Sequence, residues 1–427
     1  MRTTMPAMIA GLLLGTALGL PSTASAQQQG TDNPNPNIPV QNRARPDYDA
    51  LGIRARSFLF YPSLTLGMQY NDNVNADKNN TDSAFIGVVA PNMNIESDWS
   101  RHSLNFDIGS ESGFYSDYDS NNYTDFHFDS NGTLEITRDN ILSGLFNIKR
   151  LHDDRSSPDV NNTDQAENRK SLPRYWLINP ELRYQHNFNR LFTVIGAGYR
   201  RYDFDGPSSE NVNERDRNEY GPLARVGYTI SPRINVFGQG TYTWREYDTK
   251  QQPQDVYKNS HGYQVTLGSQ VDITGLIFGE IGVSYNNRQF DNNDFRDVSG
   301  WGGNGKLTWN VTPLTTIIGE LRSNILETTV TYDGDTADSD FQNSFSLDVT
   351  HELLRNLLLN ANGAYIRDDF QGTSRTDNVF EVGGGVTYLI NRNFSVDATY
   401  TYEDRQSDDS EAEYSRNIFM ISLTSKL

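Results

Sequence analysis

The chain lacks cysteine and, beyond its first 26 residues, any apolar run long enough to form a transmembrane helix. The missing cysteines are typical of a protein that crosses the periplasm, where stray thiols can pair wrongly. The missing apolar run excludes a membrane protein built from helices. Any membrane-spanning part of this chain must therefore be made of strands.

Basic residues are also too few to support nucleic-acid binding. Lys and Arg number 36 against 55 Asp and Glu, which gives a formal net charge of −19. A nucleic-acid partner is not expected, because phosphate binding needs a basic surface. The mean hydropathy of −0.65 resembles that of a soluble protein. A barrel wall has the same low average, since only alternate residues of each strand face lipid.

Catalytic and metal-binding motifs are missing too. The six histidines are scattered, and no G-x-S-x-G, H-E-x-x-H, C-x-x-C or phosphate-binding glycine loop occurs. Three acidic loops, 72–77, 117–121 and 333–338, lack the glycine and glutamate of an EF-hand. We expect no enzyme, no catalytic residues, no cofactor and no metal site. We interpret the acidic loops as solvated external loops that could share divalent cations with lipopolysaccharide.

The first 57 residues carry two different patterns. Residues 1–26 have a positive start, an apolar stretch and an Ala24-Ser25-Ala26 cleavage site, which predicts a signal peptide. Residues 27–57 are rich in Gln, Asn and Pro and predict a periplasmic linker. Four arginines make this linker basic: Arg43, Arg45, Arg54 and Arg56. They could anchor it to lipid phosphates, contact a periplasmic partner, or belong to a segment folded into a pore.

From residue 58 onward, short and long connections alternate between strand-like runs. Each short turn has two to four residues, whereas the other connections are longer and rich in Asp, Asn and Ser. The short turns are Asp98–Arg101, Arg138–Asn140, Asn189–Arg190, Ser231–Arg233, Thr274–Gly275, Thr312–Pro313, Arg355–Asn356 and Asn391–Arg392. This alternation predicts an all-β fold over 58–427: a transmembrane antiparallel up-and-down β-barrel with short periplasmic turns and long external loops.

The barrel is expected to have about eighteen strands, an even number that brings both ends of the wall to the periplasm. The predicted strands are 58–70, 82–97, 102–115, 123–137, 141–152, 172–188, 191–203, 218–230, 234–247, 260–273, 276–290, 298–311, 314–331, 341–354, 357–370, 378–390, 394–404 and 414–427. Such a barrel leaves an aqueous channel unless it is plugged. Candidate plugs are the connection 153–171 and the N-terminal linker.

Alternation within the strands predicts which residues line the channel. In 234–247 and 394–403 one face is apolar and ends in Tyr or Trp, which suits lipid, while the other is polar. The predicted lumen-facing residues are Asn235, Gln239, Thr241, Thr243, Arg245, Asp397, Thr399, Thr401 and Glu403. No ladder of basic residues is visible among them, so no ion preference is predicted.

The chain ends inside a strand whose apolar face carries Phe419, Ile421, Leu423 and Leu427. This face resembles the C-terminal signal read by the barrel assembly machinery, although Leu427 replaces the usual terminal aromatic residue. We therefore expect the barrel assembly machinery as a partner, and the outer membrane of a Gram-negative bacterium, with its lipid and lipopolysaccharide, as the location.

Several stretches resemble one family. They are Arg45–Asp49, Leu51–Arg54, Tyr61–Leu64, Tyr70–Val74, Ser97–His102 and Leu151–Pro158. With these stretches the chain resembles the outer-membrane proteins called putative beta-barrel porin 2. The resemblance covers nearly all of residues 27–427. Members occur in exopolysaccharide and capsule loci, and the resemblance implies cooperation with a periplasmic polysaccharide export protein. It implies no catalytic or binding residues.

Three functions follow as hypotheses. The first is a channel that conducts an exported exopolysaccharide or capsule through the outer membrane. The second is a diffusion porin for small hydrophilic solutes. The third is a non-conducting surface scaffold or adhesin. An export channel should stay mostly closed without its partner, whereas a porin should conduct steadily.

Overall fold

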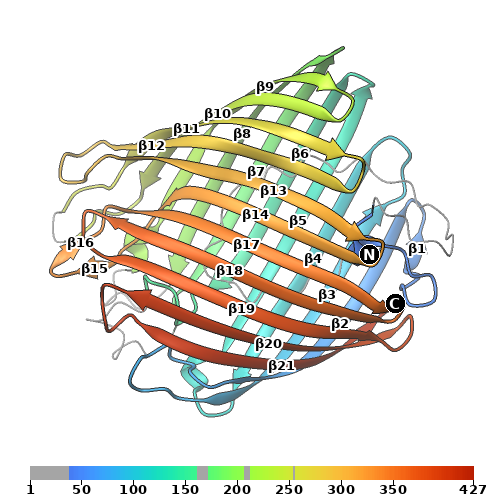
Figure 1. The fold of residues 1–427 in the computed structure, drawn as a ribbon. Helices are drawn as coiled ribbons and strands as arrows, with labels where there is room; N and C mark the ends of the chain where they lie inside the picture. The colour runs from blue at the N-terminus through green and yellow to red at the C-terminus, as the bar shows by residue number, and fades with distance from the viewer. Residues whose placement is uncertain (1–37, 161–171, 206–211, 253–254) are drawn as a thin grey trace.

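The computed structural model describes residues 38–160, 172–205, 212–252 and 255–427. Eighteen antiparallel strands close into one up-and-down barrel, in which each strand pairs with its neighbours in sequence (Figure 1). The wall strands are β2 (Phe58–Asn71), β3 (Ala84–Ser97), β4 (Ser103–Tyr115), β5 (Tyr123–Thr137), β6 (Asn140–His152), β7 (Arg174–Phe188), β8 (Leu191–Asp205), β9 (Arg217–Ser231), β10 (Ile234–Tyr247), β11 (Ser260–Ile273), β12 (Ile277–Phe290), β13 (Val298–Thr312), β14 (Thr315–Leu326), β17 (Ser339–Leu354), β18 (Leu357–Gln371), β19 (Thr376–Leu389), β20 (Phe394–Ser407) and β21 (Tyr414–Lys426). The predicted fold is confirmed.

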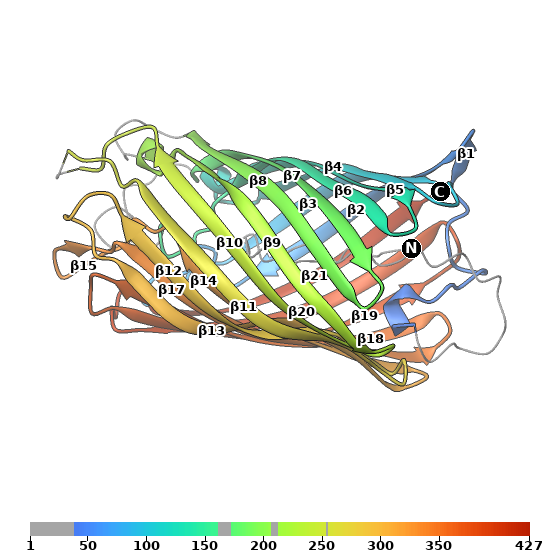
Figure 2. The same cartoon turned by 90° about the horizontal axis from the view of Figure 1, so that it is seen from above.

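The barrel closes where its first strand meets its last. β2 pairs with β21 from Ser63↔Lys426 to Asn71↔Ile418, and pairs with β3 along its other edge. Closure leaves no strand edge facing lipid, where an unpaired backbone group would be costly. Both ends of the wall lie at the same end of the barrel, as Figure 2 shows. We call this end periplasmic and the opposite end external.

Three short strands lie outside the wall. β1 (Ile53–Ala55) folds back on the start of β2, with Ile53 opposite Phe60. β15 (Thr331–Tyr332) and β16 (Asp335–Thr336) form a small hairpin at the external end, beyond the wall. Asp333 and Gly334, at the turn of this hairpin, have φ angles of 54° and 84°. Glycine adopts such positive angles readily, and Asp is among the few other residues that tolerate them.

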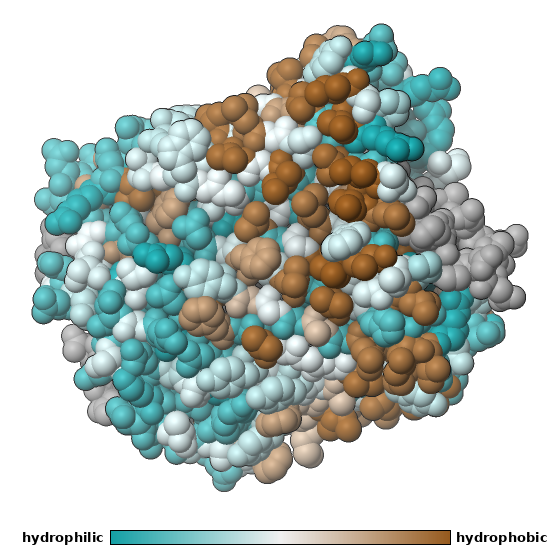
Figure 3. Space-filling view, in the orientation of Figure 1, coloured by the Kyte–Doolittle hydropathy of each residue, from teal (hydrophilic) through white to brown (hydrophobic). Residues whose placement is uncertain are grey.

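Outward-facing side chains are large and apolar along the middle of the strands. Leu267, Val283 and Trp301 are 69%, 59% and 72% exposed, as expected for residues that contact lipid rather than protein. On the face shown in Figure 3 the hydrophobic residues gather toward the periplasmic end, and the opposite end is hydrophilic. The lipid contact therefore lies nearer the periplasmic end, and the external ends of the strands reach beyond it.

Most predicted boundaries agree with the structure to within a few residues, but one strand is clearly too long in the prediction. The strand expected over 314–331 ends at Leu326. Beyond it, Glu327 and Thr328 are almost fully buried, and Thr328 bonds across the barrel to Asp159. The β-branched Thr and Val residues of 328–330 continued the strand pattern, although the chain there has left the wall.

A charge on the lipid-facing side of the wall should destabilise the barrel strongly. We expect Leu267→Arg to lower the free energy of unfolding from lipid vesicles by about 2–4 kcal/mol, because an arginine near the bilayer midplane loses its hydration. Gln264→Arg, on the inward face of the same strand, is the matched control and should cost about 1 kcal/mol through its lost hydrogen bond to Asn286. Equal losses for both variants would contradict the assigned faces.

Candidate functional site

A loop at the external end folds into the barrel instead of outward. We call the described residues that follow β6, Asp153–Val160, the inner loop. Arg416, an inward-facing residue of β21, contacts Asp154 at 3.1 Å and donates to Ser156 Oγ at 3.0 Å. Around the wall, β6 and β21 are separated by the four strands β2 to β5. The inner loop therefore reaches its partners through the lumen.

The inner loop also reaches the opposite part of the wall. Asp159 Oδ1 accepts hydrogen bonds from Thr328 Oγ1 at 2.8 Å and from the Thr329 amide at 2.7 Å. Both threonines follow β14, which is separated from β6 by the seven strands β7 to β13. A segment that bonds to β21 on one side and to the end of β14 on the other spans the channel at this level.

Arg215 makes a third set of contacts with the inner loop, in addition to those from β21 and from the residues after β14. It ends the 3₁₀ helix η5 (Val212–Arg215) that precedes β9. Its guanidinium lies 2.6 Å from Asp153 Oδ2 and 3.4 Å from Asp159 Oδ2, and it stacks 4.1 Å above the ring of Phe204. All three charged side chains are nearly buried. Buried ions need such pairing, because removing one partner leaves an unpaired charge in a low dielectric.

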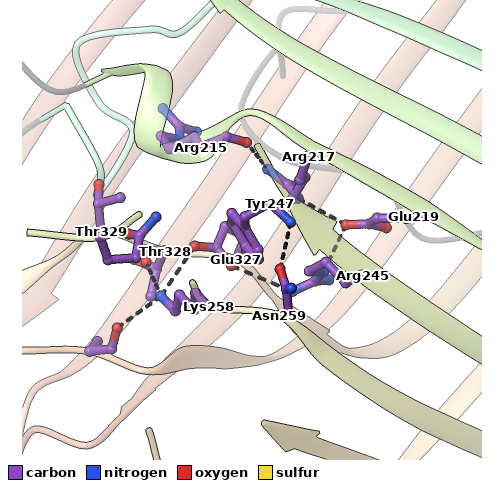
Figure 4. Close-up of polar contacts among 12 residues, drawn as sticks. Arg215, Arg217, Glu219, Arg245, Tyr247, Lys258, Asn259, Glu327, Thr328 and Thr329 are labelled. Atoms are coloured by element: carbon purple, nitrogen blue, oxygen red, sulfur yellow. Dashed lines mark hydrogen bonds and ion pairs between the residues drawn. The ribbon is translucent and has the colours of Figure 1, made fainter. Parts of the chain in front are cut away.

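Below Arg215 the wall carries a second ionic network, which Figure 4 shows. Glu327 accepts a hydrogen bond from the Tyr247 hydroxyl and pairs with Lys258 at 3.1 Å. Lys258 also donates to the carbonyls of Thr328 at 2.9 Å and Ala337 at 3.3 Å. These bonds hold Thr328, which binds Asp159, in place. The inner loop therefore binds to a part of the protein that is itself fixed by hydrogen bonds.

Glu219 is the other acid of this network. It lies 2.9 Å from Arg217 and 2.9 Å from Arg245, and Arg245 also reaches Glu327 at 3.5 Å. Arg217 stacks 3.9 Å above the ring of Tyr202. The network thus joins β9 and β10 to the loop after β14. It lies on the inward side of the wall, where its charges avoid lipid.

The periplasmic end is narrowed by a different segment, residues 38–50. The Val40 amide donates to Thr316 Oγ1 at 2.9 Å, at the start of β14. Arg45 pairs with Glu352, at the end of β17, at 2.8 Å, and both side chains are about 95% buried. Val40 has no exposed surface. In Figure 2 this segment lies within the opening at the end that holds both termini.

The four predicted linker arginines divide into two pairs. Arg43 and Arg45 are buried in the periplasmic opening, with 6% and 4% exposed surface. Arg54 and Arg56 lie near β1 and are exposed, and Arg54 pairs with Asp98 of the first periplasmic turn at 2.6 Å. The predicted signal peptide, linker residues 27–37 and the remainder of the connection 161–171 lie outside the described residues.

The nine predicted lumen residues take different roles in the structure. Five make polar contacts with neighbouring strands: Asn235 with Gln270, Gln239 with Arg225, Arg245 with Glu219, Asp397 with Thr387 and Glu403 with Arg416. Thr241, Thr243 and Thr401 are half-buried, and Thr399 is exposed. Arg245 and Glu403 reach the external networks, whereas Asn235 and Asp397 lie toward the periplasmic end.

No ladder of basic residues was visible among the nine predicted lumen residues, but the structure places further arginines beside one of them, Arg245. Inward-facing arginines near the external ends of three strands come together at this place: Arg217 of β9, Arg245 of β10 and Arg288 of β12. Consecutive members are 28 and 43 residues apart in the sequence, and only the strand register aligns them. The residues that bind the inner loop, Arg215, Thr328 and Arg416, were missed for the same reason.

Two buried carboxylates of the inner loop are held ionised by their partners. Burial alone would raise the pKa of Asp159, but the Arg215 guanidinium and hydrogen bonds from Thr329 and Thr328 lower it below its ordinary value of 3.8. Burial opposes ionisation of Asp154 too, and Arg416 and the Ser156 hydrogen bonds lower its pKa further. Both acids therefore bind protons less readily in the docked loop than in a released one.

Within the described residues, no group of three or more His, Asp or Glu side chains is arranged to hold a metal ion. Nor does any helix among them have the length and apolar character needed to cross a membrane.

The closed wall, its apolar outer surface and its polar, internally bridged lumen define an outer-membrane β-barrel of porin-like fold. The chain belongs to the family described as putative beta-barrel porin 2, whose model matches residues 45–427. A search of curated proteins gives no match.

Solved structures of similar fold come from Pseudomonas aeruginosa. OpdL is 13% identical, with 87% of this chain and 100% of that chain covered and a TM-score of 0.44. OpdO is 11% identical, with 87% and 98% covered and a TM-score of 0.45. The siderophore receptor PirA is 8% identical, with 86% and 80% covered and a TM-score of 0.41.

Acid should release the inner loop. Because the docked loop holds the pKa of Asp154 and Asp159 down, the released loop binds more protons, and lowering the pH favours release. We expect the mean conductance in planar bilayers to stay low and independent of pH above about pH 5, and to rise as the pH falls below about 4. Asp159→Asn should conduct more at neutral pH and show a weaker acid response. A conductance that stays flat down to pH 3 in the native chain would contradict this docking.

Proposed function

We propose that the protein is an outer-membrane channel for an exported exopolysaccharide or capsule, kept closed until a partner or the polymer opens it. The observation that carries the proposal is the inner loop, which spans the lumen and is held on three sides by buried ionic contacts. A channel for steady diffusion has no need of so strong a closure. An export channel does, because a pore wide enough for a polymer would otherwise leak small solutes.

The periplasmic segment supports the same proposal. Residues 38–50 occupy the opening through Arg45–Glu352 and Val40–Thr316, so a second closure lies in series with the first. A periplasmic polysaccharide export protein that displaced this segment would couple opening to delivery of the polymer. Arg54 and Arg56 are exposed beside it and give such a partner a basic contact.

The setting of the channel is part of the proposal. Export through a cleaved signal peptide and insertion by the barrel assembly machinery would place the protein in the outer membrane of a Gram-negative bacterium. The outward apolar face of β21, with Phe419, Ile421 and Leu423 exposed, has the form such machinery reads. The acidic external loops would meet lipopolysaccharide, with divalent cations between the two.

A diffusion porin for small hydrophilic solutes is the alternative. The observation that favours it is the cluster of inward-facing arginines on β9, β10 and β12, since rings of charge set ion preference in open pores. In that case the inner loop would narrow the channel without closing it.

Deletion of the gene tests the proposal. We expect surface polysaccharide to fall and the polymer to accumulate in the periplasm, and a plasmid-borne native copy to restore export. Purified native protein should show only rare openings in planar bilayers. Large, steady conductance together with unchanged surface polysaccharide would favour the diffusion porin. Normal transport of both polymer and solutes, with loss of surface binding only, would favour the scaffold.

A further inference from the structure

Arg288 is a buried arginine without a partner. It lies on the inward face of β12, and only 8% of its surface is exposed. Its Nε and Nη1 atoms are inaccessible and have no hydrogen-bond acceptor. Among the described residues no carboxylate lies within ion-pair distance of its guanidinium. A guanidinium carries five N–H donors, so leaving it unmatched in a buried position is costly unless a ligand supplies the acceptor.

The charges around Arg288 do not balance. Glu219 is the acid that interacts most strongly with Arg288, and it is already shared by Arg217 and Arg245 at 2.9 Å each, with Arg200 at 3.9 Å. The other acid, Glu327, is shared by Lys258 and Arg245. This part of the wall thus places five cationic side chains around two carboxylates: Arg200, Arg217, Arg245, Lys258 and Arg288. The excess is positive.

The neighbouring strand places no side chain opposite Arg288. Its register partner on β11 is Gly262, which has no side chain to cover the guanidinium. A Cβ atom at Gly262 would lie 3.1 Å from the Arg288 Cα and 2.2 Å from the Asn287 carbonyl oxygen. The position therefore accepts only glycine without distortion, so no β11 side chain lies against the guanidinium at this register.

We propose that Arg288, with Arg245 beside it, is a binding site for the carboxylate of an acidic sugar unit in the lumen. A guanidinium donates charge-assisted hydrogen bonds to a carboxylate, and the surrounding positive excess favours an anion. The site deepens the proposed function, on which it rests: the exported polymer would be a uronate-containing glycan.

Binding of defined sugars to the purified full-length protein tests the site. The probes are a short oligouronate, a neutral oligoglucose of the same length, monomeric glucuronate and inorganic phosphate, measured by calorimetry. Each is measured with the native chain and in an Arg215→Gln background, in which the inner loop loses its ion pairs with Asp153 and Asp159. We expect the oligouronate to bind in at least one background and the neutral sugar to bind in neither.

Arg288→Gln is the decisive variant. It should weaken oligouronate binding by about tenfold or more, as loss of a charge-assisted hydrogen bond does. Arg201→Gln, which removes the same charge from the outward face of β8, should leave binding unchanged. Because Arg288 has no partner to lose, the Tm of Arg288→Gln should equal or exceed that of the native protein.

Two results with the sugars would overturn the site: equal binding of acidic and neutral sugars, or no oligouronate binding in either background. Two results with Arg288→Gln would do the same: undiminished oligouronate binding, or a Tm lower than that of the native protein. Phosphate binding as tight as that of the oligouronate would assign the site to small anions instead. Monomeric glucuronate that matches the oligouronate would overturn the polymer as ligand. Polysaccharide export is measured separately, in the strain that lacks the gene. Normal export in that strain refutes the proposed function even if Arg288 binds uronate.

Discussion

The structure depends on closure of the hydrogen-bond ladder between β2 and β21. Lipid offers no hydrogen bonds, so a strand can face it only if both of its edges are paired. Ser63↔Lys426 to Asn71↔Ile418 supplies the last pairing, and every other strand is then fixed by its neighbours. Closure at this strand number also creates an interior too wide for wall side chains alone to fill. What occupies that interior decides whether the barrel conducts.

Two segments of the same chain occupy it, and ionic contacts fix both. The inner loop brings acids, and the wall supplies Arg215 and Arg416. The periplasmic segment brings Arg45, and the wall supplies Glu352. Charged contacts suit a closure that must open, because the same groups can be solvated by water once they separate. An apolar plug would expose hydrophobic surface on opening. The charged residues of the lumen are thus the same residues that hold the two segments in place.

Much of the architecture follows from the sequence, because strand alternation and turn length are local signals. The turn at Asn189–Arg190 or Thr274–Gly275 is visible in a few letters, and so is the alternation over 234–247. The contacts that fill the lumen are not local. Asp159 and Thr328 are 169 residues apart, and Arg45 and Glu352 are 307 apart. The segment 153–171 could be suspected as a plug from its length, but its partners depend on register around the whole wall. For the same reason, nothing in the sequence distinguishes Arg288 from the other arginines.

The claim that the inner loop closes the channel can be tested by locking it in place. The chain has no cysteine, so Asp159→Cys with Thr328→Cys introduces a single disulfide at a docking contact. The measurement is conductance of this double variant in planar bilayers before and after a reductant is added. The account predicts formation of the disulfide, low conductance while it is intact and a clear rise after reduction. Failure of the two thiols to join, or the same conductance in both states, would contradict it.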